Sequence, residues 1–184
     1  MFYFLIFAVN ITNMEKESLS SILRREARLI GLCDEWYNSW NKDASPQELI
    51  DKYFDGLDFP MKHHWPSNEF IKNNFDKGLL RKNNLLVDDK YSVLNPAEMV
   101  ALGNTVSTIR INGISHSSIY ARDKSRLNIS VRGKAFVIIH LFDQSNVDVN
   151  TFDTPNVLLL IHSNNAFYNV SDMVKVKKEL DYLK

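Results

Sequence analysis

A repeat with a period of ten residues dominates the chain between Thr105 and Val174. Cut into tens, this stretch reads TVSTIRINGI, SHSSIYARDK, SRLNISVRGK, AFVIIHLFDQ, SNVDVNTFDT, PNVLLLIHSN and NAFYNVSDMV. Apolar residues recur at positions three, five and seven of the units, as in Leu127, Ile129 and Val131. This alternation, rich in β-branched residues, predicts strands with one buried face. Turn-forming residues fall at positions eight and nine, so each unit is expected to be one strand and one turn.

Two architectures fit this period. In a β-solenoid, two units form one coil of about 20 residues, and equivalent strands stack in parallel. In an antiparallel β-meander, hairpins join successive strands, and the sheet closes into a barrel or a sandwich. Only the solenoid requires similar side chains one coil apart. Such pairs occur at Asp123/Asp143, Ser125/Ser145, Leu127/Val147, Ile129/Val149 and Ile139/Leu159. The sequence therefore favours a β-solenoid over residues 105–170, within a chain of the α+β class.

The run IYARDKSRLNI…HLFDQSNVDV resembles the D-x-S-x-V tandem repeats of β-solenoid segments in bacterial and phage-encoded proteins. Asp123–Ser125 and Asp143–Ser145 contain the Asp and Ser of that motif, whereas Asp153–Pro155 and Ser163–Asn165 depart from it. The resemblance extends over about 70 residues. It implies a shape and a phage or mobile-element setting, and it supplies no catalytic residue.

Residues 14–104 have the patterns of a helical region. Apolar residues at helical spacing predict one long amphipathic helix from Glu15 to about Trp40, with Gly31 as its weakest point. The sequence Ser45-Pro-Gln-Glu predicts a helix that starts at Pro46 and ends at Gly56. A further helix is expected from Ser67, and the same capping logic predicts a short helix from Asn95 to Leu102. The short apolar runs within 79–94 predict a small hairpin.

The two ends of the chain carry separate expectations. Residues 1–13 are apolar and lack a basic residue, so they are expected to be an upstream mis-start before Met14 or an apolar leader with a weak membrane or export role. A β-strand that pairs with the body of the protein is a further alternative. Residues 171–184 have apolar residues at three- and four-residue spacing, which predicts a C-terminal helix that caps the solenoid. No stretch approaches the roughly 20 apolar residues of a membrane-spanning helix, so no membrane span is expected.

Composition excludes several classes of function. Lys+Arg and Asp+Glu number 22 each, so no bulk positive charge indicates a nucleic-acid partner. Phosphate-binding and nucleophile-elbow motifs are absent, and no cofactor is expected. The single cysteine, Cys33, excludes an internal disulfide and favours a cytoplasmic location, or a virion if the gene belongs to a phage. Cys33 falls on the predicted apolar stripe, so we expect it to be buried.

The densest set of metal-ligating residues is His63, His64 and Glu69. A zinc site needs three or four converging ligands, and adjacent histidines in a loop point apart unless the backbone turns. The set is therefore a weak candidate for a metal site, and a solvated loop is the favoured interpretation. His140 occupies an outward position of the repeat and is expected to be a surface imidazole.

The outward positions of the repeat are polar in most units but apolar at Ile138, Leu158 and Leu160. In a solenoid, Ile138 and Leu158 would be adjacent. An apolar patch on such a face indicates either a contact with a protein partner or another copy, or a surface covered by the helical region.

These patterns favour a non-catalytic structural or protein-binding module, and they do not settle whether the chain is an enzyme. The first alternative is a small enzyme with its site near His63, His64 and Glu69. The second is an inhibitor or immunity-type protein that masks the surface of a partner.

Overall fold

The computed structural model describes residues 17–181, and the predicted leader at 1–13 lies outside them. The chain divides into a first unit that ends at Ser45 and a second unit that begins at Pro46. The first unit contains α1 (Leu19–Leu29) and α2 (Asp34–Asn38). The prediction of one long helix over 15–40 is wrong, because Gly31 adopts φ +104 and the chain turns between the two helices. Cys33 lies at this turn and is exposed, not buried as predicted.

The second unit begins with four short helices. They are α3 (Pro46–Asp55), α4 (Asp58–His63), α5 (Asn68–Asn74) and α6 (Lys77–Lys82). The predicted helices from Pro46 and from Ser67 are confirmed, and the hydroxyl of Ser67 accepts a hydrogen bond from the Phe70 amide. Helix α6 was not predicted. Its N-cap is Asp76, whose side chain accepts a hydrogen bond from the Leu79 amide.

Eleven strands follow in the described residues. They are β1 (Leu85–Val87), β2 (Lys90–Leu94), β3 (Glu98–Leu102), β4 (Val106–Ile111), β5 (His116–Ala121), β6 (Arg126–Gly133), β7 (Phe136–Leu141), β8 (Asn146–Asp153), β9 (Asn156–Ile161), β10 (Phe167–Val170) and β11 (Val174–Lys178). Odd-numbered strands form one sheet in the order β1-β3-β5-β7-β9-β11, and even-numbered strands form the other in the order β10-β8-β6-β4-β2. We call them the odd sheet and the even sheet.

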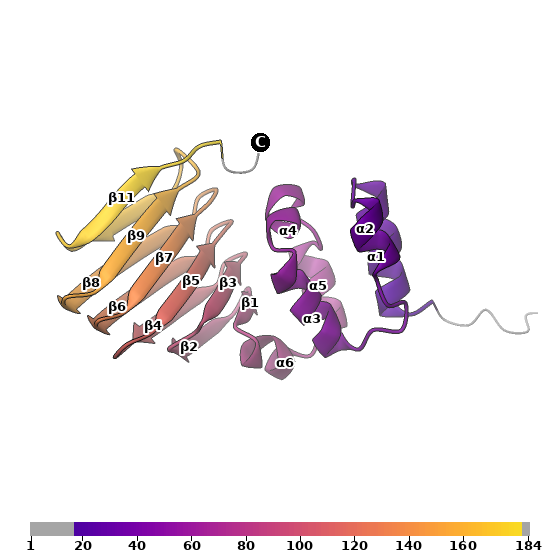
Figure 1. Cartoon of the computed structure of the whole chain (residues 1–184), viewed down its shortest axis with the longest axis horizontal. Helices are drawn as coiled ribbons and strands as arrows, with labels where there is room; N and C mark the ends of the chain where they lie inside the picture. The colour runs from indigo at the N-terminus through magenta and orange to yellow at the C-terminus, as the bar shows by residue number, and fades with distance from the viewer. Residues whose placement is uncertain (1–16, 182–184) are drawn as a thin grey trace, which may run out of the picture. The chain divides into compact units, whose positions relative to one another are not determined.

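The strands pair in parallel, and the chain is a β-solenoid with coils of about 20 residues (Figure 1). Arg126 pairs with Asn146, and Phe136 pairs with Asn156, so each strand lies on the strand one coil earlier. An antiparallel meander is therefore excluded. The inward residues of both sheets form one buried core that includes Ile119, Ile129 and Ile139.

The solenoid is longer than the repeat predicted. It begins at β1, so the segment expected to be a hairpin contains α6 and two strands that belong to different sheets. The short helix predicted over Asn95–Leu102 is wrong. Asn95 adopts φ +46 and forms a corner, and Glu98–Leu102 is β3. The C-terminal helix predicted over 171–184 is also wrong for the described residues, because Val174–Lys178 is β11; residues 182–184 lie outside them.

The corners explain why Asp and Ser recur at an interval of 20. Asp123, Asp143 and Asp153 adopt positive φ, a conformation that Asp tolerates better than most residues. Each carboxylate accepts a hydrogen bond from a backbone amide one coil earlier, on Gly103, Asp123 and Gly133 respectively. The buried hydroxyl of Ser145 donates to the Phe142 carbonyl at 2.6 Å. The corners are therefore stacked by side-chain-to-backbone bonds as well as by the strands.

The helices α3–α6 pack on the outer face of the odd sheet near its first strands. Ile50, Met61 and Ile71 of these helices share a buried cluster with outward residues of β1 and β3, Leu85 and Val100 among them. No helix in the described residues is long and apolar enough to cross a membrane.

Candidate functional site

A cavity of about 220 Å³ lies where α4 and α5 meet the corners of the solenoid. Its walls include Tyr53, His64, Trp65, Arg122 and Asp123. Burial raises the pKa of the Tyr53 phenol, and the nearby Arg122 opposes that rise. An apolar wall with converging polar groups is the usual starting point for a site hypothesis. The hydrogen-bond partners of these polar groups decide what the cavity can bind.

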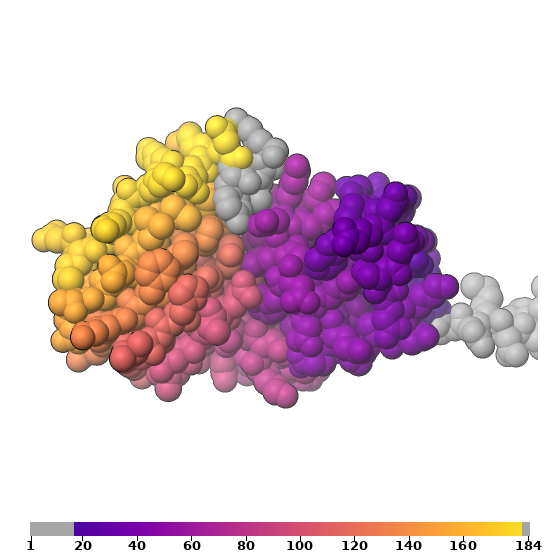
Figure 2. All heavy atoms as spheres, viewed as in Figure 1, coloured from indigo at the N-terminus to yellow at the C-terminus, as the bar shows by residue number. Residues whose placement is uncertain are grey.

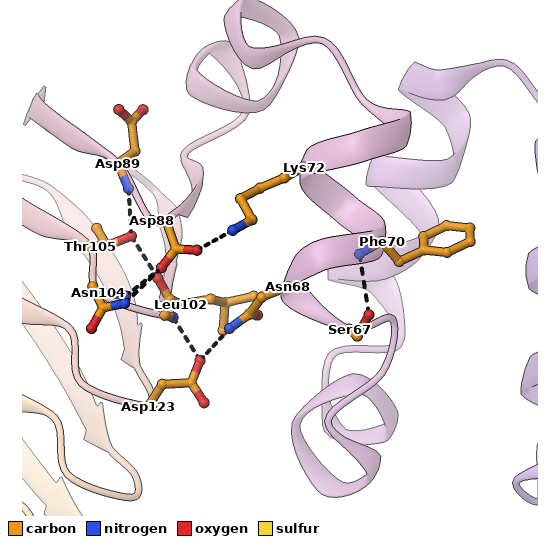
Figure 3. Close-up of polar contacts among 11 residues, drawn as sticks. Ser67, Asn68, Phe70, Lys72, Asp88, Asp89, Leu102, Asn104, Thr105 and Asp123 are labelled. Carbon is orange, nitrogen blue, oxygen red and sulfur yellow. Dashed lines mark hydrogen bonds and ion pairs between the residues drawn. The ribbon is translucent and has the colours of Figure 1, made fainter.

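The polar groups of the cavity bind one another. Nε of Arg122 donates to Oδ2 of Asp143 at 2.9 Å, and the guanidinium also contacts Nε2 of His64. Oδ2 of Asp123 accepts from Nδ2 of Asn68 at 2.8 Å and from the Gly103 amide at 2.6 Å. Figure 3 shows Asn68 pointing from α5 toward Asp123. We call His64, Asn68, Arg122, Asp123 and Asp143 the polar joint.

A second contact of the same kind lies beside the polar joint. In Figure 3, Lys72 points from α5 toward Asp88, whose other oxygen accepts from the Asn104 amide at 2.7 Å. The hydrogen bond from Lys72 lowers the pKa of Asp88. Helix α5 is therefore fastened to two corners of the solenoid through aspartates that also bond the backbone of a neighbouring coil.

The predicted metal candidates do not come together. The His63 ring packs at a tilt against Phe59, with ring centroids 4.6 Å apart, and Glu69 is exposed in the first turn of α5. His64 instead meets Asp123 and Asp143, with one ligand atom of each within 4.8 Å of the others.

This new cluster contains its own cation. The guanidinium of Arg122 lies between His64 and Asp143, and the Arg122 side chain is only 6% exposed. A bound metal ion would have to displace a paired, buried arginine, which is costly. The carboxylates of Asp123 and Asp143 also accept hydrogen bonds from backbone amides at the corners. The polar joint is accordingly best explained as an internal fastening between α4, α5 and the solenoid. The sequence did not indicate it, because His64 is far from Asp123 along the chain.

The predicted contact residues lie on the outer face of the odd sheet. Ile138 pairs with Leu158 in neighbouring strands, as the solenoid required. Both are half-buried, and Leu160 is only 8% exposed. None of the three belongs to the large exposed hydrophobic residues of the described chain. A contact with a partner at Ile138, Leu158 and Leu160 stays a prediction, and the low exposure of Leu160 weighs against it.

His140 is not a surface imidazole as predicted. It is 7% exposed and stacks between neighbours, with ring centroids 4.4 Å from Tyr120 and 5.2 Å from His162. Nδ1 of His162 lies 2.9 Å from the Glu179 carbonyl, which only accepts, so this nitrogen carries the hydrogen. Nε2 of His162 then accepts from Nδ1 of His140 at 3.0 Å. This hydrogen bond requires Nε2 of His162 to be unprotonated, because protonation of His162 removes the acceptor.

This chain of rings predicts a pH dependence of stability. Burial, reinforced by His162, lowers the pKa of His140 to about 4. An unfolded histidine has a pKa of about 6.5, so the unfolded state binds more protons between these values. The free energy of unfolding should therefore fall as the pH falls from about 6.5 to 4, by about 3 kcal/mol for this residue.

The variant His140→Phe keeps an aromatic ring against Tyr120 and removes the titrating group. In denaturant unfolding at a series of pH values, its stability should depend less on pH than that of the wild type. If the two curves run parallel between pH 4.5 and 7, His140 does not titrate as its burial implies.

Four large exposed apolar residues lie in the last described coil. We call β10, β11 and the residues between them, 167–178, the terminal coil. Phe167 is 63% exposed, Tyr168 44%, Met173 46% and Val176 40%. Tyr168 and Val176 occupy inward positions, since Tyr168 pairs with Val147 and Val176 with Leu159. Strands β10 and β11 are the last strands of their sheets in the described residues. In Figure 2 their yellow atoms lie at one end of the orange atoms of the preceding coil. Among the residues that the structure describes, no further strand covers the inward side chains of the terminal coil.

At the opposite end of the solenoid, helices cover β1 of the odd sheet, whereas β2 of the even sheet is mostly exposed. Arg81 of α6 lies over the ring of Tyr91 in β2, with its guanidinium carbon 4.7 Å from the ring centroid. Arg81 and Lys77 both pair with the buried Asp89, and the hydrogen bond from Arg81 holds the pKa of that carboxyl well below its ordinary value. The residues of β1 are buried under the helices. Within residues 17–181, the terminal coil differs in that both of its strands, β10 and β11, end their sheets and carry a partly exposed apolar residue at an inward position, Tyr168 and Val176.

Comparisons with protein-family models, curated proteins and solved structures found no match to this chain.

Proposed function

We propose that this chain is a non-catalytic protein-binding module and that the terminal coil is its contact surface. The observation that carries the proposal is the exposure of Tyr168 and Val176 at inward positions of the solenoid. Buried equivalents of these residues, such as Val147 and Leu159, are each covered by the next coil. An exposed apolar layer with unpaired strand edges is a surface that a partner chain can cover.

The polar joint supports a non-catalytic role. Its arginine, aspartates and asparagine are engaged with one another or with backbone amides. A catalytic base or nucleophile needs a group that is available to a substrate. We therefore favour binding over an enzyme site near His64, and an inhibitor that masks a partner would be one form of such a binding module.

The proposal predicts the effect of one substitution. Peptides selected from a random display library on the wild-type chain should bind the variant Tyr168→Lys about tenfold or more weakly, because a buried lysine would oppose coverage of the open layer. The matched control is Ile114→Lys, since Ile114 is 90% exposed at a corner outside the terminal coil. Isothermal titration calorimetry would measure the affinities. Equal affinity of the selected peptides for all three proteins would refute the proposal.

A further inference from the structure

The outer face of the even sheet carries a local excess of positive charge. The outward positions of β2, β4, β6 and β8 hold one carboxylate, Asp148, and four cations, Lys90, Arg110, Arg126 and Arg132. All four cations are exposed. The chain as a whole has no net charge, so this excess arises because charges of one sign are gathered on one face. We call the surface formed by these four cations the basic face.

The cations of the basic face form no ion pair within residues 17–181. By contrast, Arg81 and Arg122 pair with aspartates. The guanidinium carbon of Arg132 lies 4.3 Å from the ring centroid of Phe152, a contact that leaves the positive charge uncompensated. The carboxylate of Asp148 accepts a hydrogen bond from Nδ2 of Asn169 at 3.0 Å. Exposed positive charge without a partner attracts an anionic ligand.

The register of the strands sets the spacing of these charges. Lys90 and Arg126 stand in one column two strands apart, with Cα atoms about 10 Å from each other. Arg126 and Arg132 lie six residues apart on β6, which is about 20 Å along an extended strand. Arg110 pairs with Ser130, which falls between those two arginines. The basic face therefore suits a long ligand with several negative charges.

The positions between the cations carry hydroxyl and amide groups. They are Ser92, Thr108, Asn128, Ser130 and Asn150. Such groups donate and accept hydrogen bonds, so they match the hydroxyl groups of sugar rings. Sheets that bind single-stranded nucleic acid stack the bases on aromatic side chains, and the outward positions of β2, β4 and β6 have none. These features favour a charged polysaccharide over a nucleic acid.

The type of cation indicates the type of anion. Three of the four cations are arginines, whose planar guanidinium groups match the two oxygens of a carboxylate. Sugars that carry carboxylates are uronic acids.

We infer that the basic face binds a polysaccharide of uronic acids. Carboxylates of the polysaccharide pair with the arginines and with Lys90, and its hydroxyl groups bond the side chains between them. The inference goes beyond the proposed function, because it concerns the outer face of the even sheet and not the inward layer of the terminal coil.

The probe is a set of polygalacturonate oligosaccharides, and isothermal titration calorimetry at low ionic strength measures the affinity, since salt screens exposed charges. The full chain should bind polygalacturonate. It should bind the same oligosaccharides more weakly when their carboxylates are methyl-esterified, because the sugar hydroxyls then remain without the charge. It should also bind an oligothymidylate of equal charge more weakly than polygalacturonate.

The variant Arg110→Gln/Arg126→Gln should bind polygalacturonate about tenfold more weakly, since it removes two exposed charge pairs. The matched control is Lys62→Gln/Lys82→Gln, which removes the same charge from exposed positions of α4 and α6 and should leave the affinity unchanged. Denaturant midpoints equal to that of the wild type would establish that both variants fold.

Four results would overturn the inference. They are no binding of polygalacturonate, equal affinity for the methyl ester, tighter binding of the oligothymidylate, and equal weakening by the two double variants. None of them bears on the terminal coil, whose test uses Tyr168→Lys and library-selected peptides.

Discussion

Replacing Asp143 with alanine is expected to lower the free energy of unfolding by about 3–5 kcal/mol, because it leaves the buried guanidinium of Arg122 without its carboxylate. Nε of Arg122 donates to Oδ2 of Asp143 at 2.9 Å, and the Asp123 amide donates to the same oxygen at 3.2 Å. The loss therefore removes the counter-ion of a buried cation and one corner bond together. Denaturant unfolding followed by circular dichroism measures the change.

Asp153 supplies the matched control for Asp143. It adopts positive φ at a corner and accepts a bond from the Gly133 amide, as Asp143 does from the Asp123 amide. It is exposed, and the described residues place no arginine ion pair on it. Asp153→Ala should cost about 1–2 kcal/mol. Combining Arg122→Met with Asp143→Ala should recover part of the stability, since no buried charge then stays unpaired. If Asp143→Ala costs no more than Asp153→Ala, the polar joint does not fasten the helices to the solenoid.

Replacing Gly133 with alanine is expected to cost about 4 kcal/mol. Gly133 adopts φ +85, and an added Cβ would lie 2.6 Å from the Gly113 carbonyl oxygen one coil earlier. The left-handed conformation disfavours alanine, and crowding against backbone cannot be relieved by a side-chain rotation, so two penalties of about 1–3 kcal/mol each combine.

Gly113 separates these two penalties. It adopts φ +81, but an added Cβ would meet nothing within 4 Å. Gly113→Ala should therefore cost only the conformational part, about 1–2 kcal/mol. The difference between the two variants in denaturant unfolding measures how closely the corners of successive coils are stacked. Equal costs would mean that the coils separate easily at this corner.

The sequence predicted the middle of the solenoid well, for a physical reason. A strand that is buried on one side must alternate apolar and polar residues, and stacking of the coils repeats this requirement every 20 residues. Leu127, Ile129 and Val131 were accordingly predicted to point inward, and all three are buried. The corners were predicted from the turn-forming residues at positions eight and nine of each unit. Asp123 and Asp143 lie at these corners with positive φ, a conformation that Asp tolerates.

The ends of the solenoid were not predicted, because their sequences depart from the ten-residue period. Val106 pairs with Lys90 and Val100 with Leu85, so the first coils are shorter than the repeat, and the capping pattern at Asn95 was taken for a helix start. At the other end, Val174 and Val176 fit a strand as well as they fit a helix, and only their pairing with β9 decides between the two.

The candidate site depended on contacts that a linear pattern does not contain. The polar joint exists because α4 and α5 dock on the odd sheet, which brings His64 to Arg122. The predicted apolar patch at Ile138, Leu158 and Leu160 was located correctly on one face, but the assumption of a capping helix hid the terminal coil. Val174–Lys178 is a strand and not a capping helix, and Phe167 and Tyr168 are exposed. The terminal coil is therefore the proposed contact surface.

Site-specific photo-crosslinking tests the central claim most directly. A photoreactive phenylalanine analogue is placed at Tyr168 or at Ile114 in the full chain, in cells that naturally make it, and the products are identified by mass spectrometry. We expect one defined protein to be crosslinked from position 168 and no such product from position 114. A partner captured equally from both positions, or from position 114 alone, would contradict the claim that the terminal coil is the contact surface.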